Sequence, residues 1–331
     1  MYGFEIFHEE LMQSLIRAVH HGESGHAYLF EGVEGLGKHA AAGLLAMAMA
    51  CYHPENAPCG TCDACVQAKS GSNPDIIHIN AAGKKSVSVE IIREIAADAY
   101  VKPFEAAKKV YIIDQADMMT EQAQNTFLKL LEEPPAYAVF ILVAENASML
   151  LQTILSRCML VRFAPVSEKT IAEYIRQKYP DQEDRAAFLV RYAKGIPGAV
   201  DLVVETTDFE ELRQAAAQKL GSLLSRRSLS AYMIRDFLEE HKEQAELILD
   251  FWVDFLRDAM LLQQECPRLV SNQDLHETIR RVADSFEARQ VIFALEQVIR
   301  AKNMVKRFVK LQAVALNMSF LIKKQFYFKQ N

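Results

Sequence analysis

The sequence predicts an α/β fold with a parallel sheet in its first half and a second half made of helices. Two observations support this prediction. Between residues 26 and 144, short apolar runs of strand length alternate with segments of helical period, and beyond Pro165 every segment has helical period. Strands that alternate with helices form parallel sheets covered on both faces. A chain of 331 residues is long enough for two or three domains.

Five apolar runs are expected to form the strands of the sheet. They cover residues 27–30, 76–79, 110–113, 139–143 and 159–163. The helical segments between them cover residues 38–51, 89–100 and 121–132. Pro134 and Pro135 are expected to stop the last of these helices, because proline has no backbone N–H and clashes with the preceding turn.

The rest of the chain is expected to form two helical domains. Helices at 167–178 and 185–194, with a turn at 195–198 that leads into a third, define a small domain at residues 165–207. A bundle is expected at residues 208–331, with helices at 209–224, 231–241, 244–264 and 275–286 and a long last helix from Ala288. The α/β domain then spans residues 1–164.

The charge and hydropathy of the chain argue against several classes of protein. The 37 Lys and Arg residues and 43 Asp and Glu residues give a net charge of −6, whereas tight non-specific DNA binding rests on an excess of basic residues. No apolar run reaches the length of about 18 residues that a membrane-spanning helix needs. The N-terminus lacks a basic stretch followed by an apolar one, so we expect a cytoplasmic protein.

A glycine-rich segment directly after the first expected strand fits the phosphate-binding P-loop pattern G-x-x-x-x-G-K. Its residues are Gly32, Gly35, Gly37 and Lys38. In a P-loop, backbone N–H groups converge on phosphates and the lysine reaches the β- and γ-phosphates. The next residue is His39, where P-loops have a Ser or Thr hydroxyl that binds magnesium. The sequence therefore predicts a degenerate nucleotide site, and weak binding of ATP or ADP stays open.

An apolar strand that ends in acidic residues is the second part of an ATPase centre. The strand at 110–113 is followed by Asp114, Gln115, Ala116 and Asp117, and this order resembles the D-E-A-D pattern of AAA+ ATPases. In that pattern the first Asp orients magnesium and the Glu polarises the attacking water. Gln115 stands at the Glu position, and an amide cannot take a proton from water. Without the P-loop, the two acids would be interpreted as polar residues of a turn.

Four cysteines, Cys51, Cys59, Cys62 and Cys65, have the spacing C-x7-C-x2-C-x2-C. Two residues between thiols allow a tight turn to aim both sulfurs at one ion, and four thiolates complete the tetrahedral shell of zinc. Disulfides are rare in the reducing cytosol, so a metal is favoured. The expected site is a structural Zn²⁺ site, with an iron–sulfur cluster as the main alternative.

Further segments resemble the subunits of bacterial DNA polymerase III clamp loaders, which are AAA+ proteins. Residues 128–135 resemble their L-L-K-x-L-E-E-P-P signature, and residues 153–158 resemble their S-R-C motif. Asn146 lies where the family has its sensor-1 residue, and the family also has a cysteine module after the P-loop helix. The resemblance covers most of residues 1–200. It implies an AAA+ P-loop domain with a zinc module at about 51–65, then a helical lid and a helical collar for oligomerisation.

Three departures separate the chain from the ATP-hydrolysing gamma/tau type of subunit. They are His39, Gln115 and Gly198, the last at the lid position where hydrolysing members have a sensor-2 Arg. These departures favour the delta-prime type, for which the resemblance implies no ATPase activity of its own. A gamma/tau-type ATPase is the main alternative. A zinc-dependent nucleic-acid-binding module is another, which the acidic balance and the closed cysteine shell disfavour.

The resemblance assigns roles and partners to this chain. It implies that Asp114 and Asn146 complete the nucleotide site and that Arg157, in the S-R-C motif, is an arginine finger that reaches the nucleotide of a neighbouring subunit. The other interpretation of Arg157 is a solvated or salt-bridged residue near the start of a strand. The implied partners are the gamma/tau and delta subunits, the sliding clamp and primed DNA. The implied function is clamp loading during DNA replication.

Overall fold

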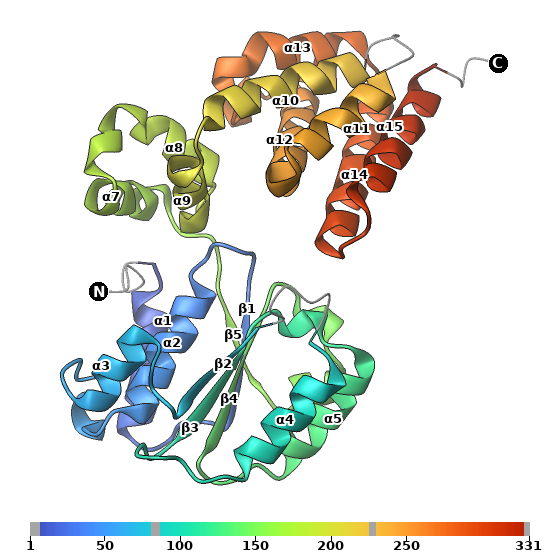
Figure 1. The fold of residues 1–331 in the computed structure, drawn as a ribbon. Helices are drawn as coiled ribbons and strands as arrows, with labels where there is room; N and C mark the ends of the chain where they lie inside the picture. The colour runs from blue at the N-terminus through green and yellow to red at the C-terminus, as the bar shows by residue number, and fades with distance from the viewer. Residues whose placement is uncertain (1–6, 81–86, 225–229, 328–331) are drawn as a thin grey trace. The chain divides into compact units, whose positions relative to one another are not determined.

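The computed structural model describes residues 7–80, 87–224 and 230–327. The chain divides into two compact units, Met1–Leu202 and Val203–Asn331, and each is described by itself. Figure 1 shows that the first unit contains all the labelled strands and that the second is made of helices. Within the described ranges, no helix is both long and apolar enough to cross a bilayer.

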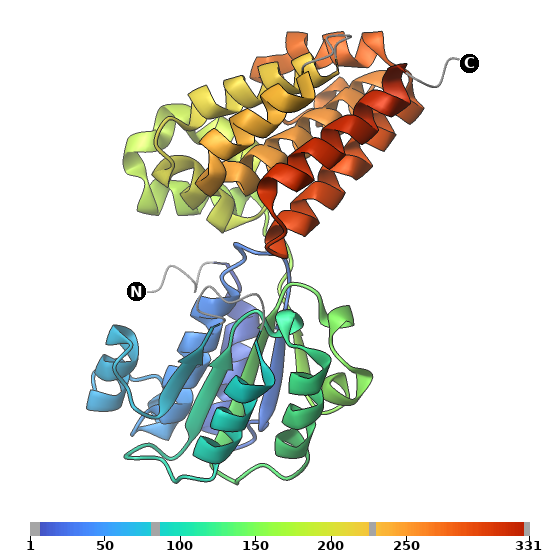
Figure 2. The same cartoon turned by 45° about the vertical axis from the view of Figure 1, so that its right-hand side comes forward.

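In the described residues, the first unit is built on a five-stranded sheet in which every pairing is parallel. Its strands are β1 (Ala27–Glu31), β2 (Ile76–Ile79), β3 (Lys109–Ile113), β4 (Ala138–Ala144) and β5 (Met159–Arg162). Their spatial order is β2-β3-β4-β1-β5. Figure 2 shows the same sheet from a direction turned by 45°. β3 and β4 are buried along their whole length, as their continuous apolar runs predict. The predicted α/β fold with a parallel sheet is confirmed.

Helices cover both faces of this sheet (Figure 1). One face carries α1 (Glu9–His20), α2 (Lys38–Ala50) and α3 (Asp63–Ser70), and the other carries α4 (Val89–Ala99), α5 (Glu121–Glu132) and the short α6 (Gln152–Leu155). Successive side chains of a strand point to opposite faces. Tyr28 and Phe30 of β1 therefore belong to the core on the α2 side, whereas Leu29 belongs to the core on the α5 side.

Three helices follow β5 in the chain: α7 (Glu168–Lys178), α8 (Ala186–Ala193) and α9 (Pro197–Glu205). The start of α7 is set by Ser167, whose Oγ accepts a hydrogen bond of 3.1 Å from the backbone N–H of Thr170. The boundary between the two compact units falls at Leu202, inside α9. The division of the chain at residues 164 and 207 into three domains stays a prediction.

The second unit is a helical bundle in the residues that the structure describes. Its helices are α10 (Phe209–Leu223), α11 (Ser230–Glu240), α12 (Ala245–Gln263), α13 (His276–Ser285), α14 (Ala288–Lys306) and α15 (Leu311–Tyr327). α12 is the most buried, and its Trp252 is fully enclosed and donates its indole N–H to the carbonyl oxygen of Ala216 at 2.8 Å. Trp252 is thus a core residue, with its one polar group satisfied.

The expectation of one long last helix from Ala288 is wrong. The chain forms α14 and α15 instead, and the segment between them contains Phe308 at φ +57, in the left-handed region. A residue in that conformation cannot continue a right-handed helix. No glycine or proline marks this break in the sequence. The helical period of the apolar residues therefore gave no sign of it.

Candidate functional site

The P-loop connects β1 to α2 and has the backbone that its glycines predict. Gly37 is the N-cap of α2 in the left-handed region, and a Cβ at Gly32 would lie 2.5 Å from the carbonyl oxygen of Phe163. Lys38 Nζ donates to the carbonyl oxygens of Gly32 at 2.6 Å and Val33 at 2.8 Å, and burial lowers the pKa of this ammonium. No side chain of the described residues caps α2, so its first N–H groups remain available to an anion. The loop therefore fits a phosphate.

His39 occupies the position of the missing hydroxyl and is paired with Asp114. Its Nδ1 lies 2.8 Å from Asp114 Oδ2 and 3.0 Å from Oδ1. The hydrogen bond with this carboxylate raises the pKa of His39, although burial acts in the opposite direction. The ring of His78 lies 5.4 Å from that of His39, and burial lowers the pKa of His78. The carboxylate that should orient magnesium is thus engaged by an imidazole of the same chain.

Gln115 begins a sharp turn at the end of β3, with φ +52. Two residues later, Asp117 Oδ2 accepts the backbone N–H groups of Glu145 at 3.2 Å and Asn146 at 3.3 Å. Asn146 uses its own Oδ1 to accept the N–H of Ser148 at 2.9 Å. Asp117 therefore fixes the loop that carries Asn146, the residue expected at the sensor-1 position. No local pattern reveals this role of Asp117, because its partners lie in a different loop.

Lys38, Asp114 and Asn146 lie at the carboxyl ends of β1, β3 and β4, and parallel strands present these ends at one edge of the sheet. Gly198, the third departure from the gamma/tau type, lies in the first turn of α9 and contacts this edge. The backbone N–H of Gly198 donates to the carbonyl oxygen of Gly35 at 2.9 Å. The start of α9 thus meets the P-loop through backbone atoms, at the position where ATP-hydrolysing members of the family are expected to have an arginine side chain.

The four cysteines predicted to bind metal are gathered by the end of α2 and the start of α3. Their sulfur atoms all lie within 4.8 Å of one another, with Cys51 to Cys62 and Cys59 to Cys65 both at 3.9 Å. Four thiolates bound to one zinc ion at about 2.3 Å would have their sulfurs about 3.8 Å apart. Hydrogen bonds from Thr61 and from the N–H of Cys62 lower the pKa of Cys59 to about 5. The donor set therefore fits a tetrahedral metal ion.

Arg157 lies at the edge of the sheet opposite to the P-loop. It precedes β5, whose first residue Met159 pairs with Tyr28 near the start of β1, whereas Lys38 follows the end of β1. Its side chain is 35% exposed and forms an ion pair with Glu132 of α5, with Nη2 2.9 Å from Oε1. A five-residue parallel strand is about 17 Å long, so Arg157 cannot serve the P-loop of its own chain.

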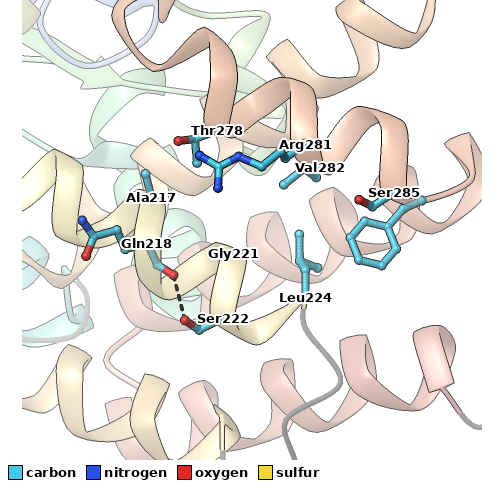
Figure 3. A pocket seen from close by; sticks show the side chains of 10 residues that line it. Ala217, Gln218, Gly221, Ser222, Leu224, Thr278, Arg281, Val282 and Ser285 are labelled. Atoms are coloured by element: carbon cyan, nitrogen blue, oxygen red, sulfur yellow. Dashed lines mark hydrogen bonds between the residues drawn. The ribbon is translucent and has the colours of Figure 1, made fainter.

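The second unit contains a groove of 670 Å³ between α10 and α13 (Figure 3). Arg281 extends across it from α13, and Gln218 and Ser222 line it from α10. None of the site residues that the sequence predicts lines this groove.

Comparisons with known proteins identify relatives of the chain. The family model described as "DNA polymerase III, delta subunit" matches residues 7–167, and "DNA polymerase III, delta subunit, C terminal" matches residues 207–324. The DNA polymerase III subunit delta-prime of Bacillus subtilis is 30% identical over 308 residues, which cover 92% of this chain and 92% of that protein. A tau/gamma subunit of Haemophilus influenzae is 34% identical over 205 residues, or 60% of this chain and 29% of that protein.

Among solved structures, a DNA polymerase III gamma subunit-related protein of Thermotoga maritima resembles the chain with a TM-score of 0.43 and 21% identity, over 95% of this chain and 99% of that one. The parallel sheet and the glycine-rich loop after β1 define a P-loop protein of the AAA+ class. The family models that match residues 7–167 and 207–324 identify a particular family within this class. The chain belongs to the family of DNA polymerase III delta-prime subunits.

Proposed function

We propose that the chain is a clamp-loader subunit that hydrolyses no ATP itself and supplies Arg157 to the ATP site of a neighbouring subunit. In this role it helps to load the sliding clamp onto primed DNA during replication. The observation that carries the proposal is the placement of the two sites. The degenerate P-loop and the partly exposed Arg157 lie at opposite edges of one parallel sheet.

The loss of hydrolysis is argued from the groups around the P-loop. Hydrolysis requires a base or a polarising carboxylate beside the water and a fully bound magnesium ion. Gln115 offers an amide, and His39 offers no hydroxyl and engages Asp114. The loop N–H groups and Lys38 do not depend on those side chains, so weak binding of ATP or ADP belongs to the proposal.

The cysteine cluster is proposed to hold one structural Zn²⁺ through Cys51, Cys59, Cys62 and Cys65. Four thiolates leave no coordination position for water, so such an ion supplies no chemistry to a substrate. It would connect the C-terminal end of α2 to the N-terminal end of α3, where the chain has little regular structure. The zinc module at about 51–65 would thus be stabilised by metal binding.

The proposed partners are the gamma/tau and delta subunits, the sliding clamp and, through the complex, primed DNA, all in the cytoplasm. We assign assembly to the collar at residues 208–331 and the contact with the P-loop to the lid at 165–207. The relatives support a complex of this kind, because those named above are subunits of one polymerase.

Two measurements test the proposal. The chain should co-purify with the other loader subunits from its own cells. The isolated chain should release no phosphate from ATP above the rate of its Lys38→Ala variant. Turnover that Lys38→Ala abolishes would instead support the alternative, a gamma/tau-type ATPase.

A further inference from the structure

The side chain of Arg157 is held by acceptors from two helices. Nη1 donates to the carbonyl oxygen of Thr153 at 3.0 Å and to Ser156 Oγ at 3.3 Å, both in or next to α6. Nη2 donates to Glu132 Oε1 at 2.9 Å, at the last residue of α5. Of these partners, Glu132 alone bears a charge, and it comes from a different element.

We propose that Glu132 is the positioning residue for Arg157: its carboxylate holds the guanidinium in place before a neighbouring subunit presents its nucleotide. The inference rests on the proposed role of Arg157 as a finger that acts in trans. Arginine has many rotamers, and a free side chain would lose this freedom when it binds phosphate. A side chain that is already held loses less, so more of its interaction with phosphate lowers the barrier.

Glu132 is itself placed by a rigid frame. α5 ends at Glu132, and Pro134 and Pro135 follow after the single residue Glu133, so the helix cannot extend further and its end is fixed. Near the start of α5, the buried Gln124 donates to the carbonyl oxygen of Met149 at 3.2 Å and accepts the N–H of Leu151 at 2.8 Å. These bonds tie α5 to the segment that leads into α6. The distance between Glu132 and the backbone of Arg157 is therefore set by buried contacts.

The neighbouring Glu133 provides a matched control. It is also exposed and belongs to the same Glu-Glu-Pro-Pro segment, but within the described residues its side chain forms no hydrogen bond or ion pair. The pair of Glu132 with Arg157 is half exposed, at 51% for the carboxylate, and exposed ion pairs are weak. We therefore expect Glu132→Ala to lower the rate that depends on Arg157 by about threefold, far less than the loss of Arg157 itself.

The test uses loader reconstituted from all its subunits, with clamp and primed DNA. The finger-dependent rate is the ATPase rate of unmodified loader minus that of loader with Arg157→Ala. Glu132→Ala should lower kcat for this rate and leave the KM for ATP unchanged, and Glu133→Ala should change neither. Glu132→Gln should retain part of the effect, because an amide oxygen still accepts the bond from Nη2. In the double variant, Glu132→Ala should add nothing to Arg157→Ala.

The outcomes separate this inference from the function on which it rests. If Arg157→Ala slows the loader and Glu132→Ala does not, the role of Arg157 as a finger is retained and the positioning role of Glu132 is overturned. If the two substitutions act additively, Glu132 acts elsewhere and the inference is also overturned. If Arg157→Ala itself leaves the rate unchanged, the proposed function fails. Thermal unfolding of each free variant checks that folding is intact.

Discussion

Gly198 and Gly35 are in direct backbone contact: the N–H of Gly198 donates to the carbonyl oxygen of Gly35 at 2.9 Å, and a Cβ at Gly198 would lie 2.6 Å from the Gly35 Cα. Gly198 therefore has a structural role besides the absence of an arginine side chain. The absence of its side chain allows the start of α9 to approach the P-loop, and any larger residue would require the two segments to separate.

We expect Gly198→Ala to destabilise the first unit by about 1–3 kcal/mol, as overpacking of a close contact does. The control is Gly43→Ala in α2, where an added Cβ meets nothing within 4 Å. That change should be neutral or stabilise by up to about 1 kcal/mol, since alanine favours a helix. Thermal or urea unfolding measures both, and equal midpoints for the two variants would show that the contact is not maintained in solution.

Metal removal should affect the cysteine module and leave the second unit intact. Elemental analysis of the purified chain should find one zinc ion per chain, and Cys59→Ser should lower that content because the tetrahedral shell loses a thiolate. Cys266→Ser, which lies outside the cluster, should leave it unchanged. Hydrogen exchange should increase at residues 51–70 after chelation. A finding of iron, or of no metal after preparation without chelators, would contradict the zinc assignment.

Single repairs of the P-loop site should not restore hydrolysis. Gln115→Glu leaves Asp114 paired with His39, and His39→Ser leaves an amide at position 115, where an ATPase has the carboxylate that polarises water. Each variant of the isolated chain should therefore release phosphate no faster than the unmodified chain. Phosphate release from labelled ATP is the measurement, and clear turnover in either variant would show that only one defect matters.

Assembly is expected to use an exposed apolar face of α14. Ile292 and Ile299 are both 41% exposed and lie two helical turns apart, so they share one side of the helix. Ile299→Asp should leave the unfolding midpoint of the free chain nearly unchanged and weaken its incorporation into loader, as measured by gel filtration. Arg300→Asp, at the next exposed position, is the control. Normal incorporation of Ile299→Asp would move the interface away from this face.

Local patterns predicted the parts of the molecule that depend on local chemistry. The strands, the glycines before Lys38 and the spacing of the four cysteines were all readable, because each is confined to a short segment. The contacts that determine what these parts can do chemically join residues that are far apart in the sequence. His39 and Asp114 are 75 positions apart and Glu132 and Arg157 are 25 apart. The arrangement of strands and helices in the folded unit brings such pairs together, and one sequence carries no signal for them.

The assignment of Arg157 as a finger for another subunit is the central claim, and the ATPase rate of reconstituted loader with Arg157→Ala tests it most directly. An arginine finger contributes about a thousandfold or more to the rate at its site. The loader should therefore lose the full share of one ATP site, with zinc content and assembly intact, and Arg157→Lys should rescue little because an ammonium lacks the planar fork. Assembled loader that hydrolyses ATP and loads clamps at the unmodified rate would contradict the account and leave Arg157 as a structural residue.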